Sequence, residues 1–190
     1  NGTPAYLERI LEIIDKLGLS DSKLVFLLDS GNDSADTIKT LTEGGHFFLI
    51  KRNLRKESPD YWQDHAKTLG TITKPREGKN VYTSSLTGKY PGDDESQSNI
   101  EIIFQVTERT IDKNGNPNLI PDIEVETWWT NMYESPENLI NLYHDHGTSE
   151  QFHSELKTDM YVERLPSGKF KVNAFILKIA IYYYKFAFIL

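Results

Sequence analysis

The segment Tyr143–Lys157 places a carboxylate and a lysine at an interval that suits one face of a helix. Thr148 and Gln151 predict a capping box, which starts the helix just before Glu150. Glu150 then lies in the first turn, where the helix dipole favours a carboxylate, and Lys157 lies two turns on, on nearly the same face. Such a face fits a site at a cleft, and a carboxylate-rich site favours magnesium or manganese. An ordinary solvated charge ladder would give the same pattern.

Asp29 is a second carboxylate that could belong to an active site. It follows Lys23–Leu28, an apolar run of strand length, which predicts a parallel strand buried on both faces. In open α/β sheets the active crevice lies outside the carboxyl ends of the strands, where Asp29 would sit. Residues 34–41 predict a short helix with Ser34 or Asp33 as its N-cap. The alternative is that Asp29 only shapes the turn at the strand end.

The remaining elements predict a core interrupted by a β-rich segment. Residues 6–17 have helical apolar spacing, and a further helix begins at Ser135 with Pro136 in its first turn. An Asn-Gly turn at residues 112–115 predicts a hairpin. Four strands are expected, at residues 46–52, 81–86, 100–108 and 123–129. The predicted organisation is a core part at residues 1–52, a β-rich insertion at 53–130 and C-terminal helices at 131–190.

The chain resembles the DDE transposases of insertion sequences, whose signature is Tyr-x2-Arg-x3-Glu-x6-Lys. Tyr143, Glu150 and Lys157 match it in register, and His146 stands where Arg is usual. The strand, Asp29 and helix resemble the segment that bears the second catalytic Asp of this family. The residues at 163–170, Glu-Arg-Leu-Pro-Ser-Gly-Lys-Phe, resemble the continuation seen in one subgroup.

This resemblance implies an RNase H-like α/β core with a β-rich insertion domain, and the activity of DNA transposition. Asp29 and Glu150 would be the catalytic, metal-binding acids of a two-metal site for Mg²⁺ or Mn²⁺. Tyr143, His146 and Lys157 would bind DNA near the cleaved strand. The implied partners are transposon-end and target DNA, bound by a homodimer of the full-length protein, in the bacterial cytoplasm at the nucleoid.

The resemblance also predicts an incomplete catalytic triad. The family's first catalytic Asp lies on an earlier core strand, whereas Asp15 falls in a helical pattern and Asp21 in a turn. We therefore expect a C-terminal fragment that is inactive alone. The last residues, 181–190, depart from the family pattern. Three alternatives remain: a metal-dependent nuclease of the same superfold, an inactive relic, and a β-rich interaction module.

Charge and aromatic residues bear on DNA binding. The net charge is −7, which is unusual for a protein that neutralises phosphates, yet Lys51, Arg52, Arg55 and Lys56 form a basic cluster. We assign Lys51 and Arg52 to DNA binding. In related transposases an aromatic residue of the insert stacks on a flipped base, and Trp128 is the candidate here. Because neighbours in a strand point to opposite faces, one of residues 128 and 129 should be exposed. The chain has no cysteine, which suits a reducing compartment.

Overall fold

The computed structural model describes residues 3–19, 24–90, 100–112, 114–145, 158 and 164–187. The chain divides into two compact units, Asn1–Asn141 and Leu142–Leu190. The described strands are β1 (Val25–Leu28), β2 (Phe47–Lys51), β3 (Thr71–Arg76), β4 (Lys79–Thr87), β5 (Glu101–Ile111) and β6 (Pro117–Thr130). The described helices are α1 (Thr3–Lys16), η1 (Ser30–Asn32), α2 (Ala35–Glu43), α3 (Pro59–Leu69), α4 (Pro136–Asp145) and α6 (Phe170–Ala187).

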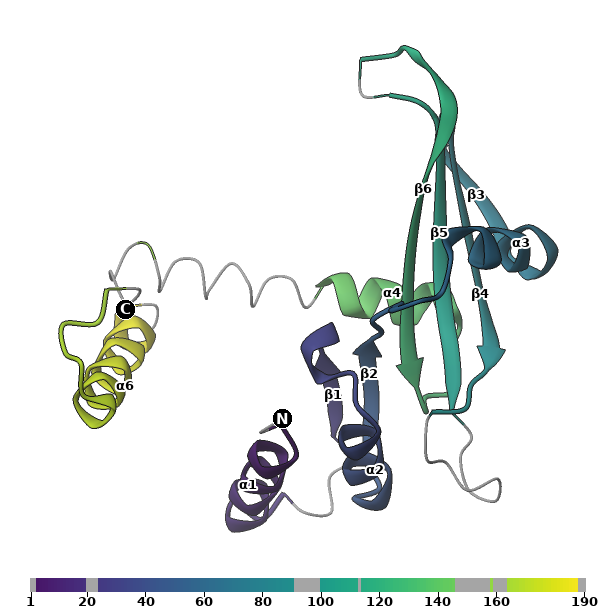
Figure 1. The fold of residues 1–190 in the computed structure, drawn as a ribbon. Helices are drawn as coiled ribbons and strands as arrows, with labels where there is room; N and C mark the ends of the chain where they lie inside the picture. Colours follow the sequence, from purple (N-terminus) through teal and green to yellow (C-terminus); the bar gives the residue numbers. More distant parts are fainter. Residues whose placement is uncertain are drawn as a thin grey trace. The chain divides into compact units, whose positions relative to one another are not determined.

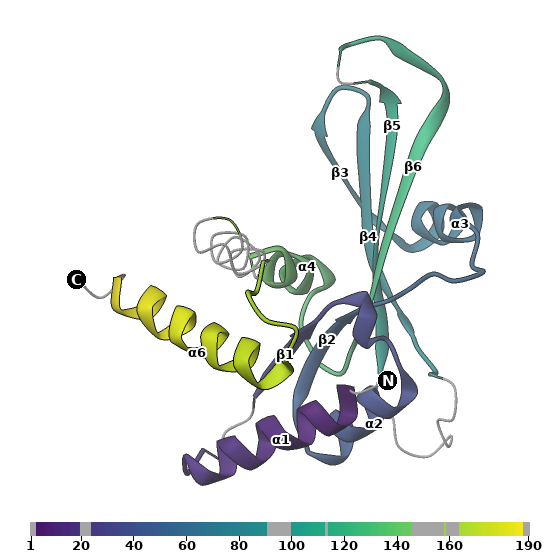
Figure 2. The same ribbon diagram turned by 60° about the vertical axis from the view of Figure 1, so that its left-hand side comes forward.

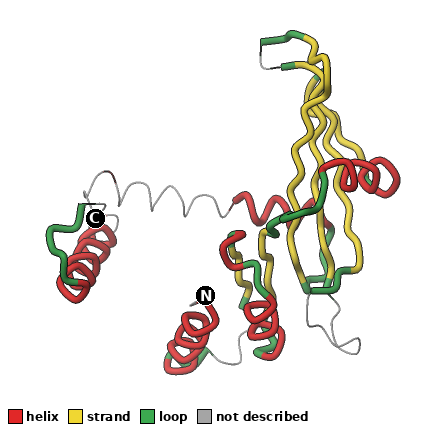
Figure 3. Tube along the Cα trace, in the orientation of Figure 1, coloured by secondary structure: helices red, strands yellow, loops and turns green. Residues whose placement is uncertain are grey.

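The first unit contains one six-stranded mixed sheet in the order β1-β2-β6-β5-β4-β3 (Figure 1). β1 and β2 are parallel, and every other neighbouring pair is antiparallel. The sheet is continuous (Figure 3). The short β1–β2 pair forms one side of it, and the β3–β4 and β5–β6 hairpins, which we call the long hairpins, form the rest. The fold class is therefore mixed α/β, as the sequence predicts at this level.

The predicted strand, helix and strand around Asp29 are confirmed as β1, α2 and β2. Ser34 is the N-cap of α2, and its hydroxyl accepts a hydrogen bond from the backbone N–H of Thr37 at 3.2 Å. The prediction that β1 is buried on both faces is wrong. Val25 is 47% exposed and the rest of the strand is half-buried. Within the described residues β1 is an edge strand, with β2 as its one neighbour.

The β-rich segment contains the three strands predicted there, as β4, β5 and β6, and two elements that the sequence did not reveal. The Asn-Gly hairpin is present, with Gly115 at φ 86°. β3 was missed because it is polar, contains Pro75 and is exposed along its whole length. α3 begins with Ser58 and Pro59, the same start signal as at residues 135–136, but its polar composition does not distinguish it from the segment around it.

The two faces of the sheet are covered differently. On one face, which we call the α2–α3 face, lie Phe48, Trp129, Ile102 and Phe104 with their in-register neighbours. α2, with Leu7 of α1, packs on the β2 side of this face, and α3 packs on β4, β5 and β6 through Trp62 (Figure 2). The opposite face, which we call the α4 face, carries Ile103, Trp128, Gln105 and Thr83. Residues of α4 lie over Gln105 and Thr83 on that side.

In the second unit, the structure describes the end of α4, residue 158 and the segment 164–187, which includes α6. Asn173 of α6 fixes the preceding turn, because its amide donates to the carbonyl of Ser167 at 2.6 Å and accepts from the Ser167 N–H at 3.2 Å. Among the described helices, none combines the length and the apolar character that crossing a membrane requires.

Candidate functional site at the carboxyl ends of β1 and β2

Asp29 lies where the sequence places it, directly after β1 at the carboxyl end of the parallel pair. Its side chain caps η1, because Oδ1 accepts hydrogen bonds from the backbone N–H of Gly31 at 3.2 Å and from the amide of Asn32. The carboxylate is exposed, and no hydrogen bond to Oδ2 is recorded within the described part of the chain. Asp29 therefore performs the turn-shaping role and still presents one oxygen to solvent.

Asp33 is the second carboxylate at this end of the sheet, and it is nearly buried, with 9% of its side chain exposed. Oδ1 accepts from the indole N–H of Trp129 at 2.9 Å, and Oδ2 accepts from the backbone N–H of Asn53 at 2.9 Å. The guanidinium of Arg55 donates to the backbone oxygen of Asp33 at 3.1 Å and lies 3.6 Å from Oδ2. Asp33 thus joins the loop after β1 to the end of β6 and to the loop after β2.

Arg52, predicted to bind DNA, is packed inside the protein. Only 8% of its side chain is exposed, and its guanidinium lies over the rings of Trp129 and Trp62 at 4.5 and 5.5 Å. Glu57 accepts two hydrogen bonds from it, at 2.7 and 3.3 Å, and also one from the indole of Trp62 at 2.9 Å. Both terminal nitrogens of this guanidinium are thus already engaged by Glu57. The assignment of Arg52 to DNA is therefore corrected to a structural role.

Lys51 and Trp128 lie on the α4 face of the sheet, as partners in the β2–β6 register. Lys51 is partly exposed and forms an ion pair with Glu126 at 2.7 Å, so its charge is largely matched. Trp128 is fully buried, which corrects its assignment as a base-stacking residue. Trp129 is also buried, at 4% exposed, so the expectation that one of the pair is exposed is wrong. Strand alternation holds, but both faces are covered at this end of β6.

The acid and bases of the Tyr143–Lys157 segment can be placed only in part. Tyr143 lies on α4 and is half-buried, with its ring centroid 6.3 Å from that of His144. His146, Glu150 and Lys157 lie outside the described residues, as does Asp21. Within the described residues no group of three or more His, Asp or Glu side chains is arranged to hold a metal ion. The expected pairing of Asp29 with Glu150 therefore stays a prediction.

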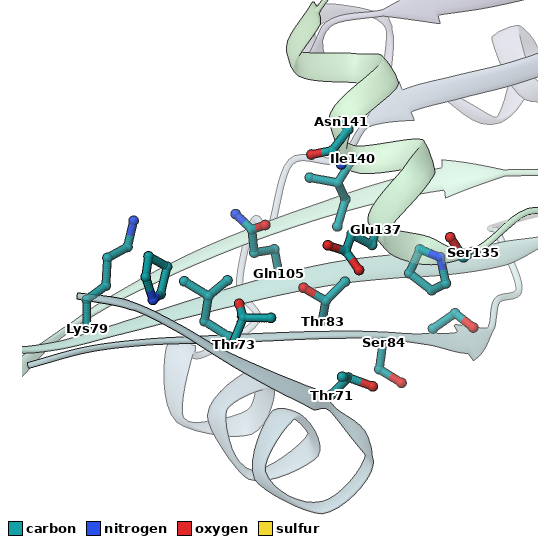
Figure 4. Close-up of a pocket in the computed structure, with 14 residues that line it drawn as sticks. Thr71, Thr73, Lys79, Thr83, Ser84, Gln105, Ser135, Glu137, Ile140 and Asn141 are labelled. Atoms are coloured by element: carbon teal, nitrogen blue, oxygen red, sulfur yellow. The ribbon is translucent and has the colours of Figure 1, made fainter. Parts of the chain in front are cut away.

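A separate cavity of about 540 Å³ lies on the α4 face between β3, β4, β5 and the start of α4 (Figure 4). Hydroxyl and amide groups line it, among them Thr71, Thr83 and Gln105, with Glu137 at the α4 end and Lys79 at the other. Such side chains suit hydrogen bonding to a polar ligand. The cavity is lined by neither Asp29 nor Asp33, so it is distinct from the candidate site.

A buried polar cluster on the α2–α3 face attaches α3 to the sheet. Glu108, with 12% of its side chain exposed, accepts from the amides of Gln63 at 3.0 Å and Asn80 at 3.3 Å and lies 3.6 Å from the Lys67 ammonium. The Tyr82 hydroxyl donates to the same carboxylate at 3.5 Å. Burial, followed by the negative charge of Glu108, raises the pKa of Tyr82 above its usual value. The cluster is internally satisfied, which indicates a structural role.

For two residues of the candidate site the sequence predicts other roles than the structure shows. It predicts Asp33 as a possible helix cap and Arg55 as a member of a basic cluster. Arg55 has φ 52°, a left-handed conformation that is unfavourable for a residue with a side chain. No local pattern reveals either role, because both depend on contacts with residues distant in sequence.

Comparison with known proteins assigns no family. No protein-family model matches the chain, and no curated protein matches it. Among solved structures, a crystal structure of a S-adenosylmethionine-dependent methyltransferase from Clostridium acetobutylicum ATCC 824 aligns with 74% of this chain at 14% sequence identity, with a TM-score of 0.22. The aligned part spans 58% of that chain. Because the TM-score is so low, nothing about fold or function follows from this likeness.

Proposed function

We propose that the chain is part of an insertion-sequence DDE transposase, which cleaves and joins DNA at transposon ends. The observation that carries the proposal is the position of Asp29: an exposed carboxylate directly after β1, at the carboxyl end of a parallel β1–α2–β2 arrangement. In α/β sheets this is the end at which active sites form. The match of Tyr143, Glu150 and Lys157 to the family signature supports the same assignment.

The finer fold assignment, an RNase H-like core with a β-rich insertion, belongs to this proposal. β1 has one neighbour within the described residues, so its outer edge can accept a further strand. In the family the strand with the first catalytic Asp belongs to the same core. The four antiparallel strands β3–β6, with α3, would be the insertion, and α4 would lead into the segment that carries Glu150.

One of the expected metal ligands, Asp29, suits a hard divalent cation. Asp29 offers an exposed carboxylate oxygen, the ligand type that Mg²⁺ and Mn²⁺ prefer. Glu150 would supply the second carboxylate, and the first catalytic Asp of the family the third. When bound, the two ions would stabilise charge on the attacking and leaving oxygens of the phosphoryl transfer. Asp29 would hold one ion through its exposed oxygen, while Gly31 and Asn32 donate hydrogen bonds to the other oxygen.

The test is Mn²⁺ binding to the 190-residue chain, followed by electron paramagnetic resonance, in the wild type and in Asp29→Asn and Glu150→Gln. If the two carboxylates share an ion, each substitution weakens binding by roughly ten-fold or more. Asp36→Asn is the matched control, because Asp36 is an exposed carboxylate in the first turn of α2. Equal Mn²⁺ affinity in all four proteins would refute the shared site.

Strand cleavage gives the second arm of the test. In a full-length protein with the complete triad, Glu150→Ala should abolish Mn²⁺-dependent cleavage of transposon-end DNA while leaving DNA binding largely intact. Retained cleavage would remove Glu150 from the catalytic set. Cleavage without strand joining would instead support the metal-dependent nuclease of the same superfold.

A further inference from the structure

The four basic residues at positions 51, 52, 55 and 56 form two pairs with different environments. Lys51 and Arg52 are engaged with Glu126 and Glu57 and belong to the sheet and its core. Arg55 and Lys56 lie in the turn that follows and are exposed, Arg55 with 60% of its side chain open to solvent. The positive charge available to a ligand therefore lies in the turn rather than on β2.

The backbone at Arg55 is held in a conformation that its side chain disfavours. Its φ of 52° is the left-handed region, which glycine adopts readily and most other residues avoid. The turn is nevertheless well supported, because the Arg55 N–H donates to the side-chain oxygen of Asn53 at 3.1 Å and the guanidinium donates to Asp33 at 3.1 Å. Strain of this kind at a supported surface turn is typical of a functional position.

The side-chain contacts of Arg55 use one of its three guanidinium nitrogens. Both involve Nη2, and within the described part of the chain Nη1 and Nε make no hydrogen bond. Their N–H groups are available to donate to the oxygens of a phosphate group. Asp33, which holds this side chain, lies four residues after Asp29 in the loop that leaves the same end of the sheet.

We propose that Arg55 binds a phosphate of the DNA strand that reaches the Asp29 site, and that Asp33 aims it there. This inference rests on the proposed function and deepens it, because it names a DNA contact that the family signature does not include. It replaces Arg52 and Trp128 as the DNA-binding residues at this end of the sheet. Arg55 is a binding residue and takes no part in the chemical step.

The left-handed backbone makes Arg55→Gly a discriminating variant. Glycine removes the strain, so the variant should melt at the wild-type temperature or above it. Arg55→Asn is the second variant, since asparagine tolerates this conformation and also lacks the charge. Arg55→Lys keeps the charge without the planar guanidinium. The charge control is Lys39→Ala, which removes an exposed lysine that is likewise paired with an acid, Glu43, at 3.8 Å.

The experiment measures binding of the 190-residue chain to a 20-base-pair duplex of random sequence across a salt series. We expect Arg55→Gly and Arg55→Asn to bind roughly ten-fold more weakly and to lose about one from the slope of log K against log salt. Arg55→Lys should keep the slope, and Lys39→Ala should match the wild type. Wild-type affinity and slope in Arg55→Gly and Arg55→Asn would overturn the phosphate contact while leaving the transposase proposal standing. A wild-type chain that does not bind the duplex even at low salt would count against the proposed function itself.

Discussion

Replacing Asp33 by alanine should destabilise the first unit more than replacing any other carboxylate near the candidate site. The change leaves the indole N–H of Trp129 without its acceptor, and this residue is only 4% exposed. An unsatisfied buried donor costs about 1–3 kcal/mol. The lost acceptor for Asn53 adds about 0.5–1 kcal/mol. The ion pair with Arg55 adds less than about 1 kcal/mol, because Arg55 is largely exposed. The sum is about 1.5–5 kcal/mol, a large part of a typical unfolding free energy.

Urea unfolding followed by tryptophan fluorescence measures this difference directly, because all three tryptophans lie in the first unit and are buried. Asp33→Asn should cost less than alanine, because its amide oxygen can still accept from the Trp129 indole. It loses the acceptor for the Asn53 N–H, since an amide N–H would face that donor. Asp36→Ala is the matched control, with an expected change within about 0.5 kcal/mol. If Asp33→Ala unfolds at the same urea concentration as the control, the contacts of Asp33 are not the anchor described above.

Three further predictions concern the long hairpins. Glu108→Ala should lower the unfolding free energy by about 1–3 kcal/mol in urea titrations, because it removes the buried acceptor of Gln63 and of its neighbours. Gly78→Ala should destabilise the β3–β4 turn, since φ is 70° and a Cβ would lie 2.5 Å from the Ile111 side chain; we expect a loss of more than about 1 kcal/mol by the same method, and wild-type stability would show that the turn can relax. Hydrogen bonds from Asn116, first from its backbone and then from its side chain, lower the pKa of Asp112 below its usual 3.8. These hydrogen bonds should stabilise the hairpin tip fully above pH 3.8, and the tip should lose this support as the pH falls through the lower pKa of the folded state. NMR spectra in acid should then show loss of the signals of the tip. Asp112→Asn should show the same loss at neutral pH.

The elements with a strong local signal could be predicted from the sequence. β1, α2 and β2 follow from an apolar run, a serine cap and a second apolar run, and the β5–β6 hairpin follows from its Asn-Gly turn. β3 could not be predicted in this way, because an exposed edge strand needs no apolar alternation and its proline argues against a strand. α3 had a clear start signal at Ser58, but its polar composition resembled that of the surrounding insert.

Of the candidate site, the sequence predicts only where single residues lie at the ends of strands. The position of Asp29 directly after β1 was predictable because the end of an apolar run marks where the chain leaves the sheet. Burial could not be deduced from residue type, so Arg52 and Trp128 were assigned to DNA although both lie inside the protein. The environment of Arg52 is set by Trp62 of α3 and by Trp129 of β6, which come from distant parts of the sequence. The same reason hides Asp33, whose partner Trp129 is 96 positions away.

This long-range anchoring changes how the β-rich segment relates to the proposed chemistry. The last three residues of β6 pair with β2, and Trp129 packs with Ile50 in the cluster that also holds α2. The indole of Trp129 then fixes Asp33, and Asp33 fixes the turn that contains Arg55. The end of the predicted insertion therefore supports the loop that bears Asp29. β6 thus connects the outer hairpin to this loop through a single side-chain hydrogen bond, that of Trp129 with Asp33.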